Sequence, residues 1–349
     1  MAPEPAGSAV RGFVARSLIA ALSLLTAGQV WAQRFSHKDW ELACDNTRTC
    51  RAAGYQRDQD QDAPLSVLLV RPAGKGAPVT GRVMLGSYDD QDVPQPARVE
   101  MAINGKSYGF VPIRQDDRVG DLKAAQVTGL LSVLAGRAEV VFSAGQHRWR
   151  LSDEGAAAVL LKMDTVQGRL ATPSALVRRG RASEEGVLPP VPMPVVQAVR
   201  VAPAQPGDAK LGDLILPHLK APGEDECVGL MEAKERPEVR RLNAGKVLVS
   251  VLCWRAAYNE GYGFWVSNDK PPYAPRLVTV AASEFDGMAS ISAAHKGRGL
   301  GDCWSSEQWV WNGQDFVHTA SATTGMCKLV AAGGAWELPT LVTEVRPPR

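Results

Sequence analysis

The sequence has no excess of charge of either sign and no long apolar stretch after its first 32 residues. Its 39 Lys and Arg residues nearly balance its 37 Asp and Glu residues, which gives a formal net charge of +2. Nucleic acids and anionic membranes are bound by concentrated basic faces, so we expect neither as a partner. A helix that spans a bilayer needs about 20 apolar residues. We therefore expect no transmembrane segment in the mature chain.

The sequence also lacks the residue patterns of common catalytic, cofactor and metal sites. It has no H-E-x-x-H pattern, no G-x-S-x-G turn and no paired Cys-x-x-Cys spacings. The glycine-rich segment 297–302 (GRGLGD) matches neither phosphate-binding glycine pattern, and we interpret it as a tight turn beside Cys303. The five histidines are scattered: His37, His147, His218, His295 and His318. We therefore expect no cofactor, no metal and no catalytic residue.

The N-terminus has the features of a cleaved signal peptide. Arg11 and Arg16 precede the apolar run 18–27 (LIAALSLLTA), and Val30-Trp31-Ala32 then places small residues at the positions that signal peptidase requires. An uncleaved membrane anchor is the alternative, but this run is too short for one. Residues 1–32 are thus predicted to be removed, and the mature chain is predicted to begin at Gln33 in the periplasm.

Six cysteines remain after residue 32, an even number in a compartment that is predicted to be oxidising: Cys44, Cys50, Cys227, Cys253, Cys303 and Cys327. Both facts favour disulfides over free thiols. Two cysteines precede a long proline-rich segment and four follow it, so Cys44 is expected to pair with Cys50. Three pairings stay open for the other four, and we favour Cys227–Cys253 with Cys303–Cys327.

The proline-rich segment divides the chain into two predicted domains. Residues 171–213 are rich in Pro and Ala, a composition that disfavours helix and central strand, and we interpret them as a semi-rigid linker. An ordered segment that wraps one domain is the alternative. Residues 33–170 are predicted to form an α+β domain with an antiparallel sheet and two helices. Residues 214–349 are predicted to form a mostly-β domain stapled by disulfides, so the whole fold is expected to be β-rich α+β.

Alternating and continuous apolar runs predict the strands, and 3.6-residue periodicity predicts the helices. Two Asn-Gly dipeptides, 104–105 and 312–313, indicate tight hairpins. Helices are predicted over 122–134 and 152–167, the second with Ser152 as N-cap. The predicted strands are 40–44, 65–70, 79–85, 99–103, 106–111, 138–142, 148–151, 246–253, 263–266, 276–280, 308–311 and 316–319.

One aromatic segment is the main candidate for a binding surface. Residues 253–265 contain five aromatic rings among glycines, and the candidate residues are Trp254, Arg255, Tyr258, Tyr262 and Trp265. Aromatic faces beside an Arg and an Asn suit stacking on sugars or gripping peptides. The alternative is that these rings fill the core of a small β domain, where aromatic residues are ordinarily buried.

Four segments resemble an exported proteobacterial family of unknown function, the domain of unknown function 1176. They are 35–51 (FSHKDWELACDNTRTCR), 297–304 (GRGLGDCW), 309–316 (WVWNGQDF) and 336–339 (WELP). The resemblance covers nearly all of the mature chain. The first predicted domain is similar, more loosely, to the invasion-associated locus B family, which opens with an aromatic–Trp–Cys strand. These resemblances imply an envelope location and no catalytic residue.

Two functions are compatible with these features. The first is a non-catalytic binding or structural module for another envelope component, a protein or a glycan. The second is a hydrolase of envelope glycans that uses carboxylates of the second domain, with Asp302, Glu307 and Asp315 as the candidates. A deep pocket with two facing carboxylates would favour the enzyme, and an aromatic surface would favour the binder.

The signal-peptide features generate the first prediction. N-terminal sequencing of protein recovered from the periplasm is expected to read from Gln33, because the small residues at 30 and 32 direct cleavage there. A chain that starts at Met1 and stays in the membrane fraction would contradict it.

Overall fold

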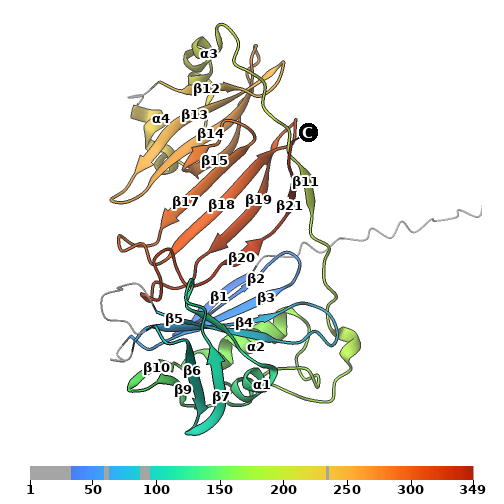
Figure 1. Cartoon of the computed structure of the whole chain (residues 1–349). Helices are drawn as coiled ribbons and strands as arrows, with labels where there is room; N and C mark the ends of the chain where they lie inside the picture. The colour runs from blue at the N-terminus through green and yellow to red at the C-terminus, as the bar shows by residue number, and fades with distance from the viewer. Residues whose placement is uncertain (1–32, 59–62, 87–94, 233–235, 349) are drawn as a thin grey trace, which may run out of the picture. The chain divides into compact units, whose positions relative to one another are not determined.

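Antiparallel β-sheets dominate the secondary structure of the computed structural model, which confirms the prediction of a β-rich fold (Figure 1). The structure describes residues 33–58, 63–86, 95–232 and 236–348. The predicted signal peptide, residues 1–32, lies outside the described residues. Within those ranges, no helix is long and apolar enough to cross a membrane. The described residues belong to one compact unit.

Two sheets and two helices form the N-terminal part. The β1–β8 sheet has the order β1-β2-β3-β4-β5-β8, and the β6–β10 sheet has the order β10-β9-β6-β7. Their strands are β1 (Gln33–His37), β2 (Trp40–Cys44), β3 (Cys50–Tyr55), β4 (Leu65–Arg71), β5 (Thr80–Leu85), β6 (Arg98–Ile103), β7 (Lys106–Pro112), β8 (Val119–Asp121), β9 (Val140–Ala144) and β10 (His147–Leu151). The helices are α1 (Ala124–Val133) and α2 (Ala156–Val166).

The core of this part lies between the two sheets and the two helices. Leu42, Leu69, Phe142 and Leu160 are among its buried side chains. Trp40 is fully buried and donates a hydrogen bond from Nε1 to the carbonyl of residue 152 at 2.8 Å.

Glycine at position 54 is required by the Trp40 ring. A Cβ at that position would lie 2.3 Å from the indole, so a residue with a side chain would displace the ring from the core.

The helix prediction for 122–134 is confirmed by α1, but the start predicted for the second helix is wrong by several residues. That helix begins after Gly155, which has φ +98°. A Cβ on Gly155 would lie 1.9 Å from the carbonyl oxygen of His37. The close approach to β1 therefore fixes the helix start, and this contact is invisible in local periodicity.

Two further sheets form the C-terminal part. The β12–β15 sheet has the order β12-β13-β14-β15, and the β16–β20 sheet has the order β16-β17-β18-β19-β20. Their strands are β12 (Glu238–Arg241), β13 (Lys246–Arg255), β14 (Glu260–Asn268), β15 (Arg276–Ala282), β16 (Glu284–Phe285), β17 (Ser290–Lys296), β18 (Trp304–Trp311), β19 (Phe316–Thr323) and β20 (Leu338–Leu341).

The β12–β15 sheet is covered on both faces. Val247, Val249 and Val251 of β13 pack against short helices on one side, and Leu248 faces the β16–β20 sheet on the other. This alternation is what a strand with two buried faces requires. The helices are α3 (Asp208–Ile215), η2 (Leu216–His218), η3 (Glu224–Cys227) and α4 (Val228–Glu232). They were missed from the sequence, where residues 171–213 were assigned to a linker and the rest to strands and turns.

Within the proline-rich segment, residues 171–202 make ordered contacts at both of their ends. Leu176 lies in the core beneath the β1–β8 sheet. Further along, β11 (Val195–Gln197) pairs in parallel with β21 (Glu344–Arg346), and the amide of Val199 donates to the carbonyl of Trp311 at 2.8 Å. Core packing and backbone hydrogen bonds thus hold these residues in place. The division into domains 33–170 and 214–349 stays a prediction.

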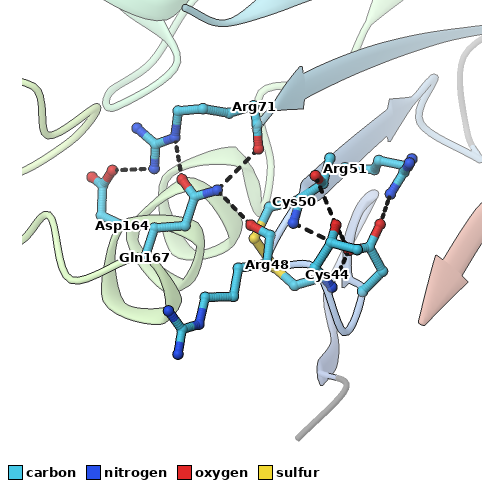
Figure 2. Close-up of a disulfide and its surroundings, with 10 residues drawn as sticks. Cys44, Arg48, Cys50, Arg51, Arg71, Asp164 and Gln167 are labelled. Atoms are coloured by element: carbon cyan, nitrogen blue, oxygen red, sulfur yellow. Dashed lines mark hydrogen bonds and ion pairs between the residues drawn. A yellow bond between two sulfur atoms is a disulfide. The ribbon is translucent and has the colours of Figure 1, made fainter. Parts of the chain in front are cut away.

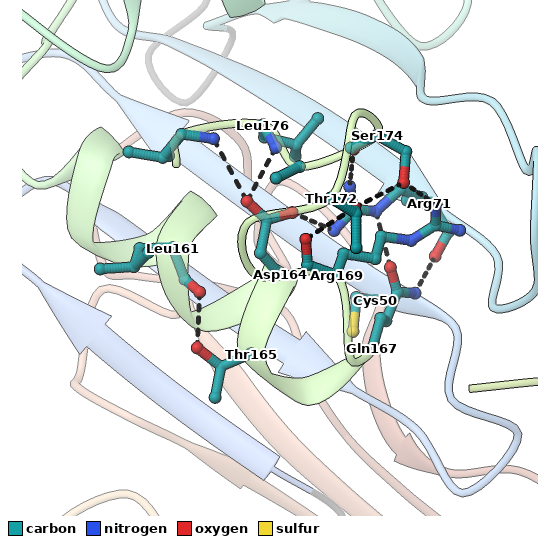
Figure 3. A network of polar contacts seen from close by, with 12 residues as sticks. Cys50, Arg71, Leu161, Asp164, Thr165, Gln167, Arg169, Thr172, Ser174 and Leu176 are labelled. Carbon is teal, nitrogen blue, oxygen red and sulfur yellow. Dashed lines mark hydrogen bonds and ion pairs between the residues drawn. The ribbon is translucent and has the colours of Figure 1, made fainter. Parts of the chain in front are cut away.

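A buried polar network holds the start of this segment. The Asp164 carboxylate pairs with the Arg71 guanidinium at 2.7 Å, and both side chains are buried. The second carboxylate oxygen of Asp164 accepts the amides of Leu176 at 2.7 Å and of Val177 at 3.2 Å (Figure 3). One carboxylate therefore ties together β4, α2 and the proline-rich segment.

The same network reaches the first disulfide through Gln167. Gln167 accepts from Arg71 Nε at 2.6 Å and donates to the carbonyls of Arg48 and Arg71 (Figure 2). Arg48 lies in the loop closed by the Cys44–Cys50 disulfide. Because the side chains of Arg71, Asp164 and Gln167 all bind one another or backbone groups, we interpret the network as a structural feature rather than a reactive centre.

All three expected disulfides form. They join Cys44 to Cys50, Cys227 to Cys253 and Cys303 to Cys327, which confirms the favoured pairing. None joins Cys44 or Cys50 to the other four cysteines.

The outer face of the β1–β8 sheet is covered by residues from the far end of the chain. Leu68 and Tyr55 of the sheet pack in one cluster with Trp336 and Leu338. Trp336 Nε1 donates to Ser66 Oγ at 2.7 Å. The core of the N-terminal sheet is therefore completed by a segment about 270 residues away in sequence.

The buried Arg71–Asp164 pair generates a stability prediction. Asp164→Asn keeps the shape of the side chain but leaves the Arg71 charge buried without its counter-ion, so it is expected to cost about 3–5 kcal/mol of unfolding free energy. Urea unfolding measures this. Glu154→Gln is the control, because the Glu154–Lys38 pair is exposed and the urea midpoint is expected to stay almost unchanged. Equal midpoints for both variants would contradict the structural role of Asp164.

A second prediction concerns pH. Burial raises the pKa of Glu41, against the lowering effect of hydrogen bonds from Tyr55 Oη and the Met326 amide, each at 2.7 Å. A raised pKa in the folded state favours the protonated carboxyl, so its contribution to stability is complete at low pH and is lost as the pH rises through that pKa. Relative to Glu41→Gln, the wild-type protein is expected to lose stability as the pH rises above about 4.5, the ordinary pKa of the group. Urea unfolding of both proteins between acidic and neutral pH tests this, and a constant difference would contradict it.

Candidate functional site

The β13–β14 hairpin, labelled in Figure 1, contributes to a cleft on the C-terminal part of the protein. We call it the hairpin cleft. Its volume is 330 Å³, which lies within the range of small-ligand sites. It is lined by Arg236, Glu238, Arg240, Leu248, Ser250, Val251, Leu252, Glu260, Tyr262, Phe264, Ser283, Glu284 and Phe285. The lining comes from β12, β13 and β14, and from the chain that passes from β15 into β16.

Strand alternation explains why these side chains meet. Glu260, Tyr262 and Phe264 occupy every second position of β14 and therefore share one face of the sheet. Leu252 lies opposite Tyr262 and Ser250 lies opposite Phe264 on β13, so their side chains belong to the same face. This face is apolar at its buried end, where Phe264 joins the core shared with the β16–β20 sheet.

Three aromatic rings give the cleft its apolar lining. Phe264 is buried, while Tyr262 and Phe285 are half-buried and pack against the same core. Phe285 also meets Phe316 edge-on, with ring centroids 6.1 Å apart. Rings held from behind by a core expose a fixed apolar surface, which suits stacking contacts with a ligand.

Charges of both signs surround these rings. Glu238, Glu260 and Glu284 contribute carboxylates, and Arg236 and Arg240 contribute guanidinium groups. Arg240 lies 3.4 Å from the Glu238 carboxylate. This ion pair is exposed, so it is weak and a ligand can replace it at little cost.

The tip of the hairpin is fixed to the neighbouring sheet. Asn259 Nδ2 donates to the carbonyl of Lys296 at 3.0 Å, and the Lys296 amide donates to Asn259 Oδ1 at 2.9 Å. The Trp254 ring lies 5.3 Å from the His295 ring. The tip is therefore held by the hydrogen bonds of the Asn259 side chain and by the contact between the Trp254 and His295 rings.

The structure separates the five residues of the predicted aromatic surface. Tyr262 lines the hairpin cleft, and Arg255 pairs with Glu260 at its rim at 3.2 Å. Tyr258 is 57% exposed at the hairpin tip, and the half-buried Trp254 donates from Nε1 to the carbonyl of Val280 at 3.1 Å. All five residues lie on the β13–β14 hairpin, but Trp265 is buried on the opposite face from Tyr262.

Trp265 is a core residue, which corrects its assignment to the surface. It is 1% exposed and packs with the valines of β13 on the face covered by the short helices. Its Nε1 donates to the carbonyl of Lys220 at 3.0 Å. Trp265 directly follows Phe264 in β14, and successive side chains of a strand point to opposite faces. Trp265 therefore points away from the cleft that Tyr262 and Phe264 line.

The three carboxylates considered for hydrolysis are not brought together. Asp302 precedes β18, Glu307 lies within it and Asp315 follows it. At about 3.4 Å per residue, the eight-residue strand holds its two ends roughly 24 Å apart. Glycosidase carboxylates lie about 5–9.5 Å apart, so Asp302 and Asp315 do not form such a pair.

Each of the outer two carboxylates also has a structural partner. Asp302 is buried, binds Arg298 and accepts the Leu329 amide at 2.8 Å, and these hydrogen bonds outweigh the effect of burial and lower its pKa. Asp315 pairs with Arg276. Asp302 also lies near the sulfurs of Cys303 and Cys327, but the disulfide leaves no thiolate there to bind a metal.

Two other hollows differ in chemistry from the hairpin cleft. A polar hollow of 220 Å³ is lined by Arg34, Ala281, Ala293, His295, Ser305, Ser306, Glu307, Ser321 and Ala322. An apolar groove of 570 Å³ lies along Leu216–Met231 beside η2 and α4. Neither combines fixed aromatic rings with charges of both signs.

Sequence reasoning found Tyr262 and Arg255 but missed the opposite wall of the cleft. Glu238, Arg240 and Phe285 come from β12 and β16, which are short strands with no strong pattern. Only the pairing of β12 with β13 and the passage of β15 into β16 bring them to Tyr262.

These features define a disulfide-stapled protein of antiparallel sheets with a surface cleft of mixed charge. Residues 34–343 match the family described as "Protein of unknown function (DUF1176)", and the chain belongs to that family. It is 24% identical over 350 residues to "Uncharacterized protein YpfG" of Escherichia coli (strain K12), an alignment that covers 91% of this chain and 96% of that protein. No solved structure matches the chain.

Proposed function

We propose that the protein is an exported, non-catalytic binding module and that the hairpin cleft binds the glycan strand of peptidoglycan. Export is supported by the predicted signal peptide and by the three disulfides, which persist in oxidising compartments. The cleft carries the rest of the proposal.

Aromatic rings with polar groups around them match the chemistry of a sugar. A sugar ring has apolar C–H faces and a periphery of hydroxyl groups. Tyr262 and Phe285 offer surfaces for the faces, while Glu260 and Glu284 accept hydrogen bonds from hydroxyl groups. Arg240 supplies donors for carboxylates and carbonyl groups of peptidoglycan.

The backbone of the cleft favours a glycan over an extended peptide. A peptide that adds to a sheet needs a strand edge with unpaired backbone groups. β13 lies between β12 and β14, and β14 lies between β13 and β15, so neither has an unpaired edge; the edge strands β12 and β16 only border the cleft. A ligand above β13 and β14 therefore meets mainly side chains, as a sugar does.

Affinity for peptidoglycan tests the proposal. The mature protein is expected to co-sediment with purified peptidoglycan sacculi, and Tyr262→Ala is expected to weaken binding at least about tenfold, since a central aromatic contact contributes about 2 kcal/mol or more. Tyr273→Ala is the matched control, because Tyr273 is a half-buried tyrosine that packs on the opposite face of the same sheet. It is expected to bind like the wild-type protein.

Three results would overturn the proposal. Wild-type protein that fails to sediment with sacculi has no such activity. Equal weakening by Tyr262→Ala and Tyr273→Ala would show a loss of fold rather than of a site. New reducing ends released from sacculi by the wild-type protein, and abolished by Glu260→Gln, would make the cleft a hydrolase site.

A further inference from the structure

We infer that the ligand is a chain of several sugars, which extends from the hairpin cleft across the hairpin tip onto Tyr258. This inference rests on the proposed function and adds a second contact region to it. The evidence is the arrangement of Tyr262, Glu260, Arg255 and Tyr258 along one hairpin.

A continuous line of polar contacts leads out of the cleft. Tyr262 Oη donates to Glu260 Oε1 at 3.5 Å, and Arg255 Nε donates to the other oxygen, Glu260 Oε2, at 3.2 Å. Glu260 lines the cleft, whereas Arg255 stands outside it at the end of β13. Hydroxyl groups of successive sugars therefore find acceptors and donors on both sides of Glu260.

Tyr258 provides an aromatic surface beyond this line. It is 57% exposed, and its ring lies on the backbone of Gly299. A Cβ at position 299 would lie 2.9 Å from the ring, so glycine allows the ring to pack closely against that loop. Part of the ring is packed and the rest faces solvent, which is the arrangement that stacking on a sugar requires.

The support under Tyr258 is rigid. The hairpin turn is closed by the Ala256 amide, which donates to the carbonyl of Asn259 at 2.8 Å. The loop beneath it is closed by the Gly297 amide, which donates to the carbonyl of Cys303 at 2.8 Å, and Cys303 is bound to Cys327. A ring held in place before binding loses little conformational entropy when a ligand arrives.

The order of residues along the hairpin indicates the direction in which the ligand extends. Glu260, the first residue of β14, lies two strand residues from Tyr262, about 6.8 Å along the strand. Tyr258 lies further along, in the turn that the Ala256 amide closes. We therefore expect one sugar to occupy the cleft at Tyr262, and a chain of several sugars to contact Tyr258 as well.

Chain-length dependence tests the inference. Isothermal titration calorimetry with peptidoglycan glycan-strand fragments of two, four and six sugars is expected to show affinity that rises at least about tenfold from two to six. Tyr258→Ala is expected to lower affinity for the six-sugar fragment about tenfold and to leave the two-sugar fragment unchanged. Tyr262→Ala is expected to weaken both.

The outcomes separate the inference from the proposed function. Equal wild-type affinity for two and six sugars, or equal effects of Tyr258→Ala on all lengths, would overturn the extended site and leave the cleft in place. No binding of any fragment would overturn both. Leu300→Ala is the control for Tyr258→Ala, because Leu300 is similarly exposed, at 55%, on the adjacent loop and is expected to have no length-dependent effect.

Discussion

The packing of Trp336 on the β1–β8 sheet is the contact on which the rest of the structure depends. An antiparallel sheet with two apolar faces must be covered on both. The inner face has α1, α2 and the β6–β10 sheet, and among the described residues the outer face is covered by the C-terminal segment with Trp336 and Leu338. That segment is further held by Lys328, whose ammonium pairs with Asp39 at 2.8 Å and with Asp58 at 2.7 Å. The β1–β8 sheet and the segment 328–338 are thus folded against each other.

The C-terminal segment that covers the β1–β8 sheet is also connected to the hairpin cleft, through the β16–β20 sheet. The covering segment joins β19 to β20 and is bridged by Cys327 to Cys303, just before β18. Ser283 lies between β15, an edge strand of the β12–β15 sheet, and β16, an edge strand of the β16–β20 sheet. Its amide donates to the carbonyl of Ser292 at 2.8 Å, and its hydroxyl accepts the Ala294 amide at 2.9 Å. The wall of the cleft that carries Glu284 and Phe285 is therefore positioned by the same sheet that the covering segment completes.

Local signals predicted much of the fold. The alternation over 246–253 is realised as β13, and Asn104-Gly105 has both residues at positive φ, as its hairpin requires. Cysteine segregation was enough for the pairing of Cys44 with Cys50. Trp265 shows where such reasoning stopped: the aromatic run was evident, but the sequence did not show that short helices cover the face of β14 on which Trp265 lies.

Long-range contacts account for what could not be predicted. Residues 324–338 cover the sheet largely with irregular structure, so their sequence shows no periodicity. The hydrogen bond from Trp336 to Ser66 joins residues that are far apart in the sequence, and no local pattern predicts it. The cleft follows the same rule. Arg255 and Tyr262 belong to one hairpin and were found together, whereas Glu238 and Phe285 join them through strand pairing that no local pattern encodes.

Backbone amide chemical shifts measured by NMR, with the glycan-strand disaccharide of peptidoglycan as the titrant, test the central claim most directly. If the hairpin cleft is the binding site, the saturable shift changes are centred on Ser250, Tyr262 and Phe285, which line it. Changes centred instead on the apolar groove beside α4, or on the polar hollow around Ser305, would contradict the assignment.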